Sequence, residues 1–419
     1  NNEGDEWIHW GYRQLANGGN ANPMARLVSG YQDSFASTIN ANLNFDQKLD
    51  FITKGLGFHL MFSFKNWSKS TTFRSLNYNH YELKNYTQNE DGTYTYVQTP
   101  KGDPSKPVLS NSGQNAGDRR YYAQAYFDYN RSFGDHTVTG MLLWNINQYS
   151  SNIFVDNVLS SLPQRKIGFA ARATYDYKHR YLIEFNAGYN GSEQFAKGHQ
   201  WGFFPSVGLG YNLSEEKFWE PIKDAVEYMK IRASYGIIGN QDISPYSTLG
   251  SLGTTGFTYG TTQSYTGYWA NGLATPDMTW EKVHQFDLGV DFGFFGNRLN
   301  VSLDYFNKKT KDALLTTSAP GYLGGTSYWV NAGEVSNKGF DATINAQIIQ
   351  TKDWSWSSSL NASYIKNEVT KLTADSPNLY GTSPSPGTVD PCNIIKEGEA
   401  IGTFYGFKWA GLEQNEKGQ

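Results

Sequence analysis

The sequence predicts an all-β protein, an antiparallel β-barrel that spans a membrane. Apolar and polar residues alternate with a period of two, which is the period of a β-strand. The clearest alternating segments have about nine to eleven residues, the length of a tilted strand that crosses a bilayer, whereas strands of soluble sandwiches have about five or six. In addition, short and long connections alternate along the chain, and aromatic residues make up 16% of it.

The clearest hairpin covers residues 167–189. Its odd positions carry mainly apolar residues and tyrosines, and its even positions carry mainly charged, polar or glycine residues. Lys178, His179 and Arg180 alone separate the two runs. This spacing predicts two antiparallel strands joined by a tight turn.

The same alternation predicts eleven further strands, which with this hairpin makes thirteen. They cover residues 35–45, 56–64, 121–129, 138–146, 203–211, 229–235, 286–292, 299–305, 340–348, 354–364 and 401–407. Gly296 and Asn297 predict a hairpin turn, and residues 214–227 predict a helical turn.

Long polar segments separate the hairpins. In outer-membrane barrels the periplasmic turns are short and the extracellular loops are long. We therefore expect residues 1–419 to be one barrel segment with extracellular loops at 65–120, 237–281, 307–338 and 367–400. Within the first of these, residues 78–86 and 93–97 predict a smaller hairpin.

Aromatic residues cluster at the predicted periplasmic ends of the strands, where amphipathic rings favour the membrane interface. They are Tyr129, Tyr177, Tyr181, Tyr211, Trp354 and Trp356. The alternative is that they are ordinary strand aromatics, which are common in any sheet. Their coincidence with the short turns favours a membrane girdle.

Composition excludes several classes of protein. Mean hydropathy is −0.58 and no run of 18 apolar residues occurs, which excludes a transmembrane helix. The net charge of −4 gives no footprint for nucleic acid. The single Cys392 excludes an internal disulfide. The seven histidines lack metal-ligand spacing, and no nucleophile motif occurs, so we expect neither an enzyme nor a metal or other cofactor.

Nine short segments together resemble a known family. They are residues 189–195, 204–206, 232–236, 239–241, 279–281, 297–299, 304–305, 331–333 and 337–339. In order and spacing, across roughly residues 121–407, the sequence resembles the SusC-like (RagA-like) TonB-dependent transporters of the Bacteroidetes outer membrane.

The resemblance implies a 22-stranded barrel in the Gram-negative outer membrane, filled by an N-terminal plug domain. It also implies import of oligosaccharides or peptides, with a SusD-like surface lipoprotein as lid and energy from the TonB complex. Neither a plug domain nor a TonB box is found in the 419 residues. We therefore expect the chain to be an internal barrel segment of a longer polypeptide.

Aromatic loop residues are the candidates for substrate contact. A planar ring stacks on a sugar or a peptide side chain while neighbouring polar groups bind the rest. The candidates are Trp201, Tyr265, Tyr268, Trp269, Tyr322, Tyr328 and Trp329. Packing within the loops or contact with the lid is the alternative role for each.

Two other functions remain open. One is a passive porin or an adhesin-type barrel without TonB coupling. The other is a soluble glycan-binding β protein, which the long apolar strand faces disfavour because they would expose a large apolar belt to water. The sequence does not separate an oligosaccharide cargo from a peptide cargo.

Overall fold

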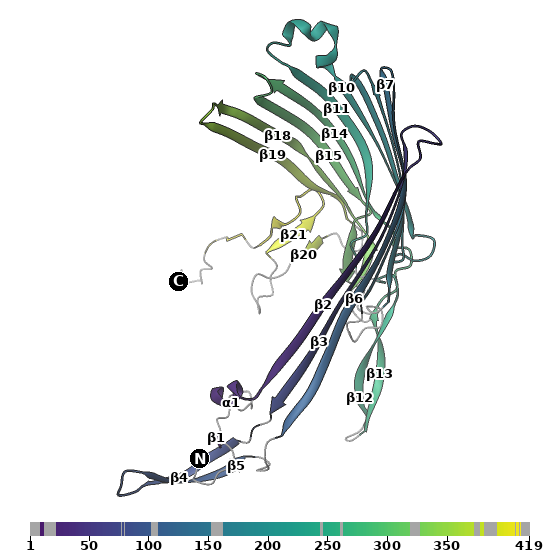
Figure 1. Ribbon diagram of the computed structural model, residues 1–419. Helices are drawn as coiled ribbons and strands as arrows, with labels where there is room; N and C mark the ends of the chain where they lie inside the picture. Colours follow the sequence, from purple (N-terminus) through teal and green to yellow (C-terminus); the bar gives the residue numbers. More distant parts are fainter. Residues whose placement is uncertain are drawn as a thin grey trace. The chain divides into compact units, whose positions relative to one another are not determined.

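The computed structural model of the chain is almost entirely β-structure (Figure 1). It describes residues 9–11, 22–76, 78, 80–101, 108–151, 162–243, 246–259, 263–318, 327–372, 378–380, 392–406, 408–409 and 411. Among them, no helix has the length and apolar character to cross a membrane.

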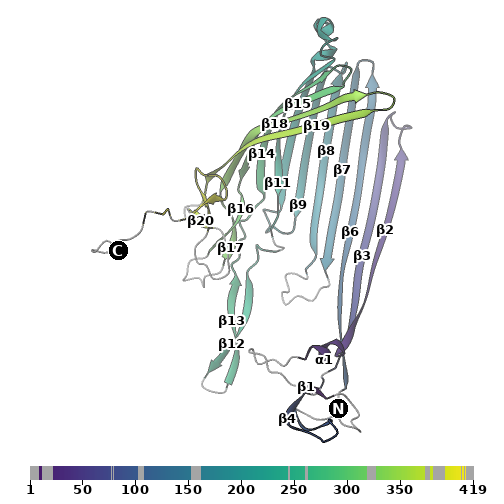
Figure 2. The same ribbon diagram turned by 90° about the vertical axis from the view of Figure 1, so that its left-hand side faces the viewer.

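Twelve strands of the described residues form one sheet, in the order β19-β18-β15-β14-β11-β10-β9-β8-β7-β6-β3-β2. Their bounds are β2 Gly30–Lys48, β3 Leu56–Leu76, β6 Leu109–Phe133, β7 His136–Ser151, β8 Gln164–Tyr177, β9 Tyr181–Ser192, β10 Trp201–Asn212, β11 Tyr228–Asn240, β14 Glu281–Phe294, β15 Leu299–Lys311, β18 Glu334–Gln350 and β19 Ser355–Lys371. From β8 to β19 every pairing is antiparallel. Figure 2 shows these strands side by side.

The chain divides into two compact units. One contains Asn1–Ala41, Phe64–Arg120 and Tyr149–Leu162, and the other contains Asn42–Ser63, Tyr121–Gln148 and Pro163–Gln419. The first unit holds helix α1 (Pro23–Leu27), capped by the side chain of Asn22, and a sheet of β1 (Trp10–Gly11), β4 (His80–Gln88) and β5 (Tyr94–Lys101). The β4–β5 hairpin is the smaller hairpin that the sequence predicts.

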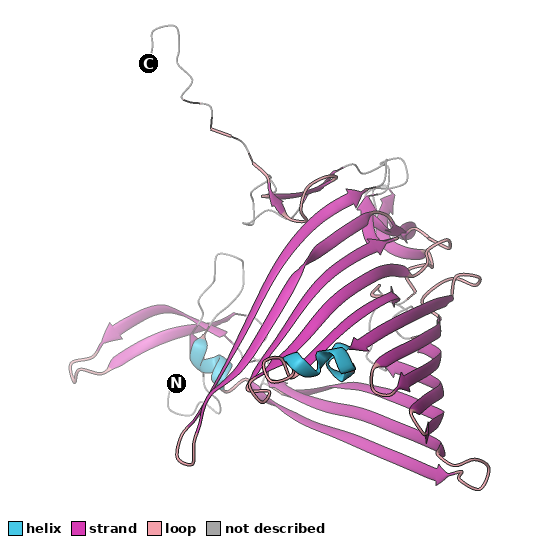
Figure 3. Ribbon diagram, turned by 90° about the horizontal axis from the view of Figure 1, so that it is seen from above, coloured by secondary structure: helices cyan, strands magenta, loops and turns pink. Residues whose placement is uncertain are grey.

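The second unit holds most of the large sheet, which is curved when viewed from above (Figure 3). Most of its strands are joined by short connections at one end, which we call the turn end, and by longer ones at the other, the loop end. The exception at the turn end is the β10–β11 connection, residues 213–227. Two side hairpins belong to the long connections, β12–β13 (Ser251–Tyr259 and Gln263–Gly272) and β16–β17 (Leu314–Ser318 and Ser327–Asn331).

The two faces of this sheet differ as the alternation predicts. Tyr177 lies opposite Tyr181, and Tyr181 lies opposite Tyr211, so the odd residues of β8, β9 and β10 share one face. Exposed apolar side chains such as Phe185 and Leu209 cover this apolar face. Charged and polar side chains cover the other, the polar face. The predicted hairpin at residues 167–189 is confirmed by its register.

Besides the side hairpins within the predicted loops, the structure differs from the expected element list in the first long loop, in the helical turn and at the last strand. The first long loop is partly strand, because β3 continues to Leu76 and β6 begins at Leu109. Polar residues on both faces hide this extension from the hydropathy pattern, although the backbone still pairs. The helical turn is a pair of 3₁₀ helices, η1 (Leu213–Glu215) and η2 (Lys217–Ile222).

The thirteenth expected strand, 401–407, does not join the large sheet. Within it, β22 (Thr403–Phe404) pairs with β21 (Asn393–Lys396), which in turn pairs with β20 (Asn378–Tyr380). Gly402 has a φ of 80°, a conformation that ends an extended run on the amino-terminal side of β22. Phe407 lies outside the described residues.

Candidate functional site

A guanidinium on the polar face is held between two carboxylates. Arg232 on β11 donates from Nε to Asp291 Oδ2 on β14 at 2.9 Å and from Nη2 to Asp304 Oδ2 on β15 at 2.9 Å. Its Nη1 lies 2.7 Å from Asp304 Oδ1. Ser302 also donates to Asp291, at 2.8 Å. We call these four residues the arginine clamp.

The clamp depends on a glycine. Gly289 lies between Arg232 and Asp304 in the sheet register. A Cβ at this position would lie 2.6 Å from Cζ of Arg232, far inside van der Waals contact. The guanidinium therefore crosses β14 directly over the backbone, which any larger residue would prevent.

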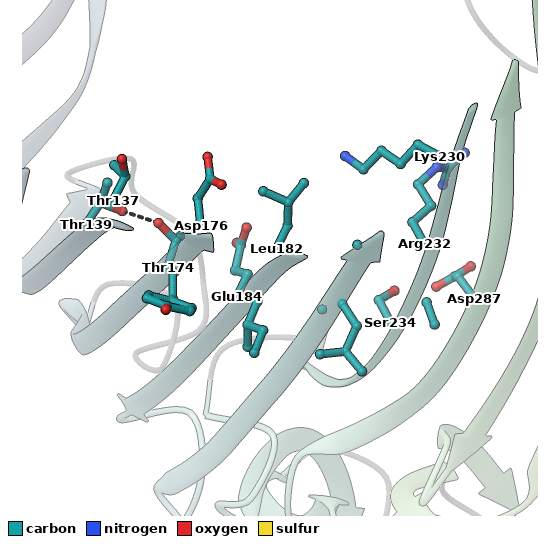
Figure 4. A pocket seen from close by; sticks show the side chains of 16 residues that line it. Thr137, Thr139, Thr174, Asp176, Leu182, Glu184, Lys230, Arg232, Ser234 and Asp287 are labelled. Carbon is teal, nitrogen blue, oxygen red and sulfur yellow. Dashed lines mark hydrogen bonds between the residues drawn. The ribbon is translucent and has the colours of Figure 1, made fainter. Parts of the chain in front are cut away.

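A groove of about 450 Å³ lies beside the clamp on the same face (Figure 4). Gly208 and Gly210 contribute no side chains to it, while Glu184, Asp287 and Lys230 line it with charges of both signs. Such a lining keeps a surface hydrated and can bind polar groups.

Neighbouring charges on the groove wall are fixed by hydrogen bonds. Glu184 accepts from Arg172 at 3.1 Å and from Asn186 at 2.9 Å. The described residues contain no group of three or more potential metal ligands. Arginine side chains thus hold Glu184, Asp291 and Asp304 in place, which gives this face a fixed arrangement of charged side chains.

A second feature is a small hydrophobic core among the connections at the loop end. Buried side chains from three connections and from the start of β16 form it, with Phe204 and Trp329 packed against it. The buried members are Phe195, Ile243, Met278, Trp280 and Leu314. We call this cluster the loop core.

Phe204 joins the loop core to the sheet. The centroid of its ring lies 5.3 Å from that of Trp280, in an edge-on arrangement with an interplanar angle of 64°. A Cβ at Gly202 or at Gly239 would lie 2.8 Å from Cε2 of Phe204. Because both neighbours are glycines, the ring has room to lie against the backbone of β10 and β11, and the connections pack around it.

Hydrogen bonds from Asn331 hold the loop core together. Its Oδ1 accepts from the backbone N–H of Thr279 at 2.7 Å, and its Nδ2 donates to the carbonyls of Thr279 at 2.8 Å and Asp312 at 2.9 Å. Glu281 adds two contacts, accepting from the N–H of Leu314 at 3.0 Å and from the Asn240 side chain at 3.2 Å.

The loop core contains most of the segments that carry the family resemblance. Residues 189–195, 204–206, 239–241, 279–281 and 331–333 all contribute to it or border it. Sequence reasoning assigned no role to Phe195 or Trp280, whose side chains are 1% and 4% exposed. Both residues lie in segments that carry the family resemblance, and this was the only feature of the sequence that marked them as important.

Trp201, a candidate for substrate contact, lies on the apolar face. It is 43% exposed, and its ring stacks on Tyr189 with the centroids 4.7 Å apart. Phe203, two residues further along β10, lies on the same face opposite Tyr189. This position favours contact with lipid, so Trp201 is not part of the substrate site proposed below.

The other candidates fall into two groups. Tyr265 and Tyr268 are exposed on the β12–β13 hairpin; Trp269 belongs to the same strand, but its side chain lies outside the described part of the structure. Tyr328 and Trp329 are half-buried on β17, where Trp329 packs against the loop core. Tyr322 lies outside the described residues.

These features define a class of protein. A curved antiparallel sheet with an exposed apolar face and a charged, hydrated polar face is the wall of a membrane-spanning β-barrel. The short connections at one end and the long, folded connections at the other are typical of outer-membrane barrels.

The family follows from comparison with known proteins. Residues 3–389 match the family model described as TonB dependent receptor-like, beta-barrel, and the chain belongs to this family. It is 32% identical over 317 residues to TonB-dependent receptor P3 of Formosa agariphila, covering 70% of this chain and 31% of the relative. It is 31% identical over 247 residues to TonB-dependent receptor SusC of Bacteroides thetaiotaomicron, covering 57% of this chain and 24% of SusC.

The fold resembles that of the RagAB peptide transporter, with a TM-score of 0.69, 21% identity, and coverage of 93% of this chain and 42% of that one. The chain spans about a third of the length of the Formosa relatives it matches. The expected fold class, resemblance and outer-membrane location are confirmed by these findings. Members of this family are not enzymes, as expected.

Proposed function

We propose that this chain forms the barrel wall of an importer that takes up oligosaccharides or peptides across the outer membrane, with energy from the TonB complex. The observation that carries the proposal is the polar face, where the arginine clamp and the groove beside it form a charged, hydrated wall opposite the apolar face. The family match and the similarity to SusC support coupling to TonB.

A SusD-like surface lipoprotein is the proposed partner at the loop end. The resemblance to SusC-like transporters supports this partner, and the connections at the loop end offer an ordered base for it. The loop core fixes them to one another through buried side chains and through the contacts of Asn331.

The proposed substrate contacts are Tyr265, Tyr268, Trp269, Tyr322 and Tyr328. Tyr265 and Tyr268 are 54% and 71% exposed, so their rings are accessible for stacking on a ligand. Trp329 packs against the loop core, and we propose that it supports the site from behind.

Binding to the full-length protein tests these contacts. The double variant Tyr265→Ala, Tyr268→Ala is compared with Tyr86→Ala, Tyr94→Ala, which removes two tyrosines of similar exposure from the β4–β5 hairpin. A panel of labelled oligosaccharides and peptides identifies the cargo class. We expect the first variant to bind the cargo about tenfold more weakly and the second to bind it normally. Equal affinities for both variants would remove these tyrosines from the site.

Uptake in cells tests the coupling. Import that stops when a protonophore collapses the inner-membrane potential supports TonB dependence. Import that continues at the same rate would replace the proposal with a passive porin.

A further inference from the structure

Lysines gather on the apolar face at the loop end of four neighbouring strands. Lys282 on β14 lies opposite Lys311 on β15, and Lys338 on β18 lies opposite Lys366 on β19. Lys309 on β15 lies between these pairs, opposite His284 and Ser336. We call these five lysines the basic band.

The register places the basic band on the apolar face. Tyr305, Phe340 and Tyr364 lie opposite one another in one row of that face. Toward the loop end, Lys338 lies two residues before Phe340 and Lys366 lies two residues after Tyr364, and alternate residues of a strand share a face. On β18 and β19 the band therefore begins roughly 7 Å beyond this row, at about 3.3–3.4 Å per residue. Phe286 on β14 lies in the same register row as Lys338 and Lys366.

The opposite end of the same strands has a different character. At the turn end, this face carries Phe292, Val301, Ile344 and Leu360 in register, followed on β19 by Trp356. The described residues of β14, β15, β18 and β19 place no lysine on this face at the turn end. On these strands, the turn end of the apolar face thus carries aliphatic and aromatic side chains, whereas the loop end carries lysines.

Most of the charge in the band is not neutralised by neighbours. Lys309 lies 3.1 Å from Glu334, and Lys366 lies 3.6 Å from Glu368. Among the ion pairs of the described residues, none involves Lys282, Lys311 or Lys338. The band therefore has excess positive charge, which calls for an anionic partner from outside the described chain.

We propose that the basic band binds the phosphate groups of an anionic glycolipid in the leaflet at the loop end. A lysine can lay its aliphatic stem along an apolar surface and extend its ammonium group into the headgroup layer. The band continues directly from the lipid-facing surface, and an anionic membrane surface attracts lysines held close to it. The proposal rests on the orientation in the proposed function, with the loop end outside the cell.

Lipid binding by the full-length protein in detergent tests the proposal. Bisphosphorylated lipid A is titrated against the wild type and two triple variants. One variant is K282Q/K311Q/K338Q, which neutralises the lysines without acidic partners. Its matched control carries K54Q/K223Q/K352Q, which removes the same charge from exposed lysines in turn-end connections. Heat-modifiable migration in SDS gels shows that each variant is folded, and if the first triple does not fold, K338Q alone replaces it.

We expect the first triple to bind lipid A about 100-fold more weakly, or K338Q alone about fivefold, and the control to bind within about twofold of the wild type. Removing the lipid phosphates or raising the salt concentration should abolish the difference. Equal weakening in both triples, or none in the first, would overturn the proposal, as would wild-type binding that does not depend on the phosphates. If the control variant lost more affinity for lipid A than the first triple variant, the lipid would bind at the turn end, which would reverse the assumed orientation and overturn the proposed site.

The measurement needs no substrate, lid or TonB complex, so it is independent of the transport proposal. Phosphate-dependent binding in a protein that fails to import would support the lipid site and refute only the transport function.

Discussion

Removing the side chain of Asn331 is the sharpest test of the loop core. Asn331→Ala eliminates three hydrogen bonds that join residues 279, 312 and 331. At about 1 kcal/mol net for each bond, the closed arrangement loses about 3 kcal/mol. Local opening should become about 150-fold more frequent, because 1.4 kcal/mol corresponds to a factor of ten. The large sheet should keep its stability, since none of the three bonds lies within its strand pairings.

Hydrogen exchange followed by mass spectrometry measures this opening. Peptides covering residues 273–281 and 312–314 should exchange about 150-fold faster in Asn331→Ala, while β8 and β9 peptides are unchanged. Asn331→Asp provides a graded variant, because a carboxylate still accepts from the N–H of Thr279 but donates to neither carbonyl. It should lose about 2 kcal/mol and accelerate exchange about 30-fold. Exchange at wild-type rates in both variants would refute the view that these bonds close the loop core.

Three further predictions concern packing and charge. Trp280→Ala should cost the loop core about 3–5 kcal/mol and expose it to protease, whereas Trp356→Ala, which alters a 56% exposed side chain, should not change the cleavage pattern. Arg232→Met should lower the free energy of unfolding in urea by about 2 kcal/mol, because two neighbouring carboxylates lose their shared partner; neutralising both aspartates in the same protein should restore most of it. A hydrogen bond to Asp135 raises the pKa of Lys178 above its ordinary 10.5. The stabilisation that this ion pair gives the folded state is present at neutral pH and is lost as the pH rises through the raised pKa of Lys178. Raising the pH above 10.5 should therefore accelerate the unfolding of Lys178→Met, which lacks the ion pair, less than that of the wild type.

The main strands could be predicted because the membrane imposes a simple rule. Each crossing must present apolar side chains to lipid and bond its backbone to a neighbour, and the resulting alternation is readable over about nine residues. Tyr177 and Tyr181 face each other as the hairpin pattern requires. The rule does not apply where both faces of a strand are polar, so the hydropathy pattern does not predict the extensions of β3 and β6. There, serine pairs such as Ser75 and Ser110, at 2.7 Å, replace the apolar signal.

The candidate site could be predicted only in part. Aromatic residues in loops were treated as one class, but the structure assigns them to three environments: the apolar face for Trp201, the loop core for Trp329, and an exposed hairpin for Tyr268. Residue type alone cannot separate these environments, because they depend on which connections pack together. The arginine clamp was equally hidden, since Arg232, Asp291 and Asp304 come from three strands that only the register brings together.

The positions of the segments that resemble SusC-like transporters also suggest which part of the chain selects the substrate. Lipid-facing strands accept many sequences because lipid requires only apolar surface, so little specific sequence is expected there. The loop core, in contrast, needs particular residues: a glycine on each side of Phe204, and an amide at position 331 that both donates and accepts. Phe204, Gly239 and Asn331 fall in the segments that resemble SusC-like transporters, whereas Tyr265 and Tyr268 do not. If the shared segments build the support and the hairpin carries the contacts, exchanging residues 251–272 with a relative of known cargo should transfer cargo preference without changing the exchange protection of the loop core. Transfer of preference by residues 279–281 instead would show that the support itself selects the substrate.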